Sequence, residues 1–115
     1  MMEQLLTIGL FLVIGHFIAD YVFQTDAIAI GKNNKINHSH LTVPWYYWML
    51  THSMVHGLAV YLITNSVILL LAEVFAHFLI DFSKCRGWIG LHTDQILHIS
   101  CKIAYIAVLF SWSIQ

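Results

Sequence analysis

Apolar residues fill four long stretches of the chain, and polar residues gather in the connections between them. The apolar stretches cover residues 5–23, 45–63, 67–82 and 96–112. Each approaches the roughly 20 residues that a helix needs to cross the hydrocarbon core of a bilayer. With Asn, Gly, Ser and Pro marking the connections, we expect helices over about 4–30, 45–64, 66–84 and 93–114. The pattern predicts an all-α fold: a four-helix transmembrane bundle with up-down-up-down topology, forming a single integral membrane domain over 1–115.

Composition points the same way. Hydrophobic residues make up 59% of the chain and charged residues 10%, which is outside the range of ordinary soluble domains. The net charge of −1 and the lack of a basic run argue against nucleic acid as a partner. Lys32, Lys35, Lys84 and Arg86 flank one side of the expected bundle, and the positive-inside rule places that side in the cytoplasm.

Each expected helix carries two polar residues spaced four apart, so the two share one helix face. The pairs are His16 and Asp20, His52 and His56, His77 and Asp81, and Asp94 and His98. With helices that alternate in direction, all four pairs fall at one depth on the same side of the bilayer. We therefore expect them to meet in the bundle core.

The two halves of the chain repeat this arrangement. HFIAD at 16–20 is followed by THSMVH at 51–56, and HFLID at 77–81 is followed by TDQILH at 93–98. His-Phe-x-x-Asp on one helix is thus followed twice by Thr-x-x-x-x-His on the next. This predicts a duplicated helical hairpin.

Imidazole and carboxylate ligands without thiolate favour zinc, with Mn²⁺ or Fe²⁺ as alternatives. We expect two or three ions per chain, because three aspartates in an apolar bundle are costly without cations. The eight expected ligands are His16, Asp20, His52, His56, His77, Asp81, Asp94 and His98.

Polar residues beside the pairs leave alternatives open. Glu73 either pairs with Lys102 at the same depth or acts as a ninth ligand. Gln24 either holds a water or substrate oxygen or bonds to a neighbouring helix. His38, His40 and His92 fall in connections, where they are expected to be solvated.

The motifs GHFIADYVFQ, THSMVHG, AHFLIDFSK and TDQILH together resemble a family of small bacterial and phage inner-membrane proteins of unknown function, over nearly the whole chain. That family is similar to membrane-bound metal-dependent hydrolases and, distantly, to zinc-dependent phospholipase C and the single-strand-specific zinc nucleases. The resemblance implies a multinuclear zinc site that cleaves phosphate esters. It also implies a multi-pass protein of the bacterial inner membrane, and the positive-inside rule puts the site near the cytoplasmic face.

The leading hypothesis is therefore a zinc-dependent hydrolase of a phosphate ester or anhydride, acting on a phosphorylated lipid or a nucleotide. The residues expected to act in catalysis are Asp20, Asp81, Asp94 and Gln24, and those expected to contact phosphate are Lys84 and Arg86. Two alternatives stay open: a divalent-cation or proton transporter, and a non-catalytic, metal-stabilised regulator that binds another membrane protein. The pattern leaves the oligomeric state undetermined.

Overall fold

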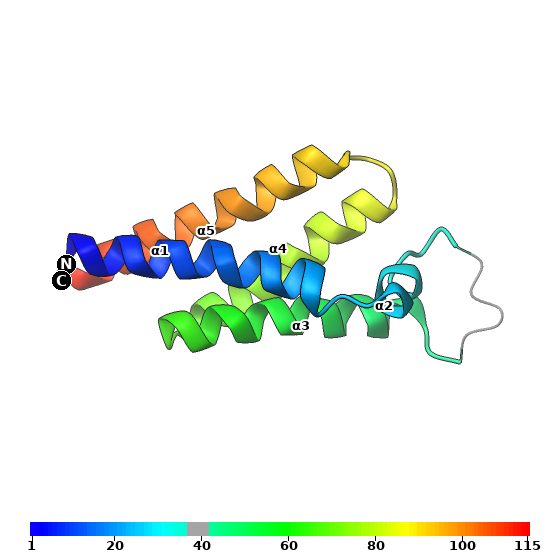
Figure 1. The fold of residues 1–115 in the computed structure, drawn as a ribbon, viewed down its shortest axis with the longest axis horizontal. Helices are drawn as coiled ribbons and strands as arrows, with labels where there is room; N and C mark the ends of the chain where they lie inside the picture. The colour runs from blue at the N-terminus through cyan, green and yellow to red at the C-terminus, as the bar shows by residue number, and fades with distance from the viewer. Residues whose placement is uncertain (37–41) are drawn as a thin grey trace.

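The computed structural model describes residues 1–36 and 42–115, and these residues form helices and connections without a strand (Figure 1). His38 and His40 lie outside the described residues. The elements are α1 (Met2–Phe17), the π-helix η1 (Ile18–Val22), α2 (Asp26–Gly31), α3 (Trp45–Thr64), α4 (Val67–Cys85) and α5 (Leu91–Ser113).

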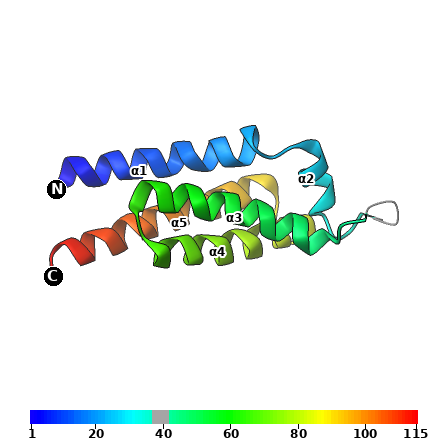
Figure 2. The ribbon, with the colours of Figure 1, turned by 90° about the horizontal axis from the view of Figure 1, so that it is seen from below.

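The four long helices alternate in direction, so both termini lie at one end of the molecule (Figures 1 and 2). Each long helix packs against two neighbours: α1 and α4 each contact both α3 and α5. Within the described residues, two helical stretches are long and apolar enough to cross a membrane, Met2–Val22 and Leu91–Ser113. The chain is thus all-helical, and two of its helices have the properties of membrane spans.

The first helix differs from the expectation of a single helix over 4–30. The α-helix changes to a π-helix at Ile18 and ends at Phe23. Thr25 then adopts an extended backbone and its hydroxyl accepts a hydrogen bond from the Ile28 N–H at 3.3 Å, which caps the short helix α2. The other three long helices begin and end within two residues of the expected bounds.

The connection between α3 and α4 is a tight turn. Asn65 takes the left-handed conformation, with φ of 54°, directly after α3, and Asn tolerates this conformation better than most residues. Ser66 follows in an extended conformation, and its hydroxyl accepts a hydrogen bond from the Leu69 N–H. Together these residues turn the chain back so that α4 packs along α3.

The interior of the bundle is more polar than its surface. Among the described residues, twelve polar or charged residues are buried but only seven hydrophobic ones. Leu12, Val60, Leu69 and Tyr105 form an apolar core cluster, whereas large hydrophobic residues such as Leu62 and Phe75 are exposed. This distribution inverts that of a water-soluble domain.

Gly57 sets the close approach of α3 and α4, and Gly57→Ala should destabilise the protein. A Cβ at this position would overlap the Val74 side chain and lie 3.1 Å from the Leu70 carbonyl oxygen, which the helix holds in place. Although Ala is the better helix former, overpacking should lower the free energy of unfolding by about 1 to 2 kcal/mol. Thermal unfolding in detergent measures this.

The matched control is Gly15→Ala on α1. There the nearest atom is the end of the flexible Ile63 side chain, at 3.1 Å. We expect this variant to keep the stability of the wild type or exceed it. Equal melting temperatures for Gly57→Ala and the wild type would show that α3 and α4 do not depend on the glycine.

Candidate metal centre

The structure brings all eight paired residues together. Each of the four long helical segments contributes two, and all eight side chains are buried. The His77 ring stacks between those of His56 and His98, with centroids 3.6 and 4.2 Å away. The His16 ring lies on the other side of His56 and His98, at 5.2 and 5.0 Å. The alternation of helix direction therefore places the pairs at one level.

Asp20 comes from η1, the π-helical segment that continues α1. Its Oδ1 atom lies 3.3 Å from His52 Nε2 and 3.4 Å from His56 Nε2. These three atoms, and His77 Nε2, are buried and have no hydrogen-bond partner. Buried polar atoms are almost always satisfied, and π-turns of this kind occur frequently at functional sites. Four buried donor atoms without hydrogen-bond partners thus face one another, in an arrangement that could hold a metal ion.

Donor atoms of Asp20, His52, His56 and His77 lie within 4.8 Å of one another, and we call these residues the Asp20 group. Asp81, Asp94 and His98 meet the same criterion and form the Asp81 group. Within the described residues a third set, His16, His77 and His98, shares members with both. The arrangement therefore offers two ligand groups with a shared imidazole layer between them.

In the Asp81 group, His98 Nε2 lies 3.4 Å from Asp81 Oδ1 and 3.5 Å from Asp94 Oδ1. The other carboxylate oxygens are occupied by ammonium groups. Lys32 donates to Asp81 Oδ2, and Lys84 donates to Asp94 Oδ2 at 3.2 Å. The Oδ1 atoms and the imidazole thus face one another, while lysines neutralise the two carboxylates from the outside.

Glu73 lies one turn deeper and pairs with Lys102, which decides between the two alternatives for this residue. Lys102 Nζ donates to Oε1 at 2.5 Å and the Tyr105 hydroxyl donates to Oε2 at 2.8 Å. Glu73 Oε1 also lies 3.5 Å from His77 Nδ1. Glu73 therefore lies behind an imidazole of the Asp20 group, although His77 Nδ1 makes no hydrogen bond in the structure.

Two residues of the cluster were missed by the sequence reasoning. Lys32 is buried because α2 folds it back over Asp81, and a residue after a helix break has no periodic signal. Gln95 Oε1 lies 3.0 Å from His16 Nε2, and its Nε2 donates to Asp20 and Asp94. Since Gln95 precedes His98 by three residues, helical spacing could have identified it.

The remaining residues expected at the site differ in their surroundings. Arg86 is exposed, with its guanidinium 5.7 Å above the Trp88 ring, whereas Lys84 does reach the cluster. Gln24 lies in the break between η1 and α2, half-buried, and its Oε1 has no hydrogen-bond partner. Gln24 follows Asp20 by four residues, which in a continuous α-helix would put both on one face. The π-helix and the break after it interrupt that spacing. His92 is exposed at the start of α5, as expected.

Residues 8–115 match a family described as "Protein of unknown function (DUF3307)". The chain belongs to the DUF3307 family. Comparison with curated proteins and with solved structures gave no match. Membership of a family of unknown function is thus confirmed, whereas the bacterial inner-membrane location and the similarity to metal-dependent hydrolases stay predictions.

The pair of Glu73 and Lys102 predicts a strongly non-additive effect of two substitutions. Lys102→Met should lower the free energy of unfolding by about 3 to 5 kcal/mol, because it leaves the Glu73 carboxylate buried without its cation. Adding Glu73→Gln removes that charge and should restore most of the loss. Denaturant unfolding of the single and double variants in detergent measures the coupling. A double variant no more stable than Lys102→Met would contradict a buried ion pair.

Proposed function

We propose that the protein is a membrane-embedded, metal-dependent hydrolase that cleaves a phosphate ester or anhydride. Zinc is the favoured ion, and Mn²⁺ or Fe²⁺ also suit the ligands. The observation that carries the proposal is the convergence of unpartnered, buried donor atoms from Asp20, His52, His56 and His77. In the observed geometry none of these atoms makes a hydrogen bond, and one divalent cation would serve all four residues as a shared partner.

The charges of the cluster favour the Asp20 group as the first metal site. The buried carboxylates of Glu73, Asp81 and Asp94 each contact a lysine ammonium. Among the described residues, Asp20 faces imidazoles and the Gln95 amide and no lysine. The sequence analysis invoked metal ions to offset the charges of three aspartates. In the part of the chain that the structure describes, lysines offset the charges of Asp81 and Asp94, and Asp20 alone of the three has no lysine beside it.

The second site in the proposal is formed by Asp81 Oδ1, Asp94 Oδ1 and His98 Nε2. Asp94 Oδ1 has no hydrogen-bond partner, and both Oδ2 atoms stay with their lysines. His16 lies beside both groups, with Nδ1 unpartnered and Nε2 on Gln95. We therefore propose two ions, with His16 as an additional ligand or a contact for substrate.

When bound, such a pair of cations supplies an activated water and stabilises the charge that develops on phosphoryl oxygens. The protein's own residues position the metals and the phosphate. The Asp20, Asp81 and Asp94 carboxylates hold the centre, and Lys84, which is one quarter exposed, provides a cation for a phosphate that approaches from outside. In the reaction, the water oxygen bonds to phosphorus, the bond to the leaving oxygen breaks, and that oxygen receives the proton lost by water.

The proposal places all four long helices in a membrane. The polar interior and apolar surface support this, as do the two helical stretches with the properties of spans. Lys32 and Lys84 at the cluster, with Lys35 and Arg86 nearby in sequence, put the site at the cytoplasmic side by the positive-inside rule. A bacterial inner membrane is the proposed location.

A transport path is the weaker alternative. Beyond the Glu73 and Lys102 pair, Leu12, Val60 and Leu69 fill the core, and an ion would meet only hydrocarbon there. The other alternative is a regulator that binds metal for stability and has no catalytic activity. Only a measurement of substrate turnover distinguishes it from the proposed enzyme.

Asp20→Asn tests the proposed chemistry. The substitution removes the carboxylate that lacks a lysine, so hydrolysis of bis(p-nitrophenyl) phosphate or p-nitrophenyl phosphate in detergent with added Zn²⁺ should fall by roughly a hundredfold or more. Asp26→Asn is the matched control, because Asp26 is exposed in the first turn of α2; its activity should equal that of the wild type. Equal turnover by all three proteins would contradict the assignment of the site.

A further inference from the structure

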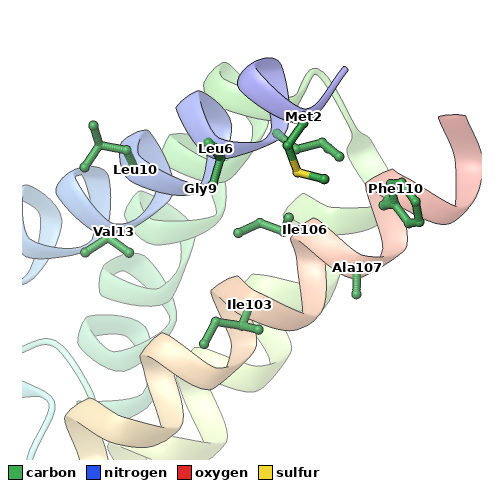
Figure 3. Close-up of a pocket in the computed structure, with 10 residues that line it drawn as sticks. Met2, Leu6, Gly9, Leu10, Val13, Ile103, Ile106, Ala107 and Phe110 are labelled. Atoms are coloured by element: carbon green, nitrogen blue, oxygen red, sulfur yellow. The ribbon is translucent and has the colours of Figure 1, made fainter.

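An apolar groove runs between α1 and α5 in the half of the bundle away from the metal centre. Figure 3 shows it between the two ribbons, with Leu6, Gly9 and Val13 on α1 and Ile103, Ala107 and Phe110 on α5. Its volume is about 630 Å³, within the range of small-molecule sites. The residues that line it are hydrophobic or glycine, so its chemistry suits a hydrocarbon chain.

The groove and the metal centre lie along the same side of the first helix, with Val13 of the groove one turn before His16 of the cluster. Leu6, Gly9, Val13 and His16 follow one another within α1 at intervals of three and four residues, so they lie in one stripe, and Asp20 follows His16 in η1. The first three line the groove and the last two belong to the cluster. From Met2 to His16 the helix rises about 21 Å, which is most of the depth of a hydrocarbon core of roughly 30 Å.

The Gln95 side chain connects α5 to the first helix at the level of the cluster. Gln95 of α5 bridges to His16 and Asp20 of α1 and is partly exposed. Its neighbour Asp94 carries the partly exposed Lys84 ammonium. An anionic group that displaced the Gln95 amide would therefore meet donor atoms and a cation at the end of the groove.

We infer that the substrate is a lipid phosphate whose hydrocarbon chain lies in the groove between α1 and α5, while its phosphate enters the centre beside Gln95. This inference rests on the proposed function and names its substrate class. It commits to a membrane lipid because the stripe joins an apolar groove to a phosphate-compatible site within the depth of a bilayer.

Ala107→Trp tests the groove, because Ala107 is exposed on its wall and an indole there would fill it. The matched control is Ala104→Trp, an equally exposed position of the same helix outside the groove lining. Two readouts are needed: hydrolysis of a long-chain phosphatidic acid relative to glycerol phosphate, and retention of that lipid in native mass spectrometry. Ala107→Trp should reduce the preference for the long chain and the retention by roughly tenfold or more, and Ala104→Trp should preserve both.

The outcomes separate this inference from the proposed function. Hydrolysis of both substrates with the same preference and retention in all three proteins would overturn the groove and leave the hydrolase standing. Hydrolysis of neither substrate by the wild type would contradict the hydrolase, and the substrate assignment would fall with it even if Ala107→Trp alone lost the lipid. Melting temperatures of the two Trp variants establish that a loss does not come from unfolding.

Discussion

The structure depends on the need to satisfy ionic groups buried inside a bundle whose outer surface is apolar. Five imidazoles and four carboxylates from four helices share one interior region. Each unpaired charge in such surroundings costs several kcal/mol. Three carboxylates are neutralised by Lys32, Lys84 and Lys102. Asp20 contacts no lysine within the described residues and faces the imidazoles of His52 and His56, and this difference in charge balance is the basis on which we propose a cation there.

The π-helix η1 and the break that follows it contribute to the charge balance of the cluster. The π-helix η1 widens the turn that carries Asp20, so that its Oδ1 faces both histidines of α3. The break after η1 allows Thr25 to start α2, which returns Lys32 to Asp81. A continuous α-helix through residue 30 would carry that lysine away from the core. The same break interrupts the four-residue spacing that would have put Gln24 on the same helix face as Asp20.

The regular features were predictable from the sequence, whereas features that depend on tertiary contacts were not. Spacing by four residues identified the pairs, and alternating helix directions placed them at one level, so their meeting in the core followed. The same register argument offered the pair of Glu73 and Lys102 as one of two alternatives, and the structure contains that pair. Lys32 was read as a flanking charge because a lysine in a connection carries no periodicity. Arg86 was assigned to phosphate by proximity in sequence to Lys84, yet helix α4 ends there and Arg86 points to Trp88.

Metal content per chain tests the central claim most directly. Elemental mass spectrometry on protein purified gently in detergent would compare the wild type with His56→Ala, which removes a donor of the Asp20 group, and with His92→Ala, an exposed histidine at the start of α5. The account predicts at least one divalent ion per chain in the wild type and in His92→Ala, and a loss in His56→Ala. A wild type without metal, or equal content in all three proteins, would contradict it and leave the cluster as a network of buried ion pairs.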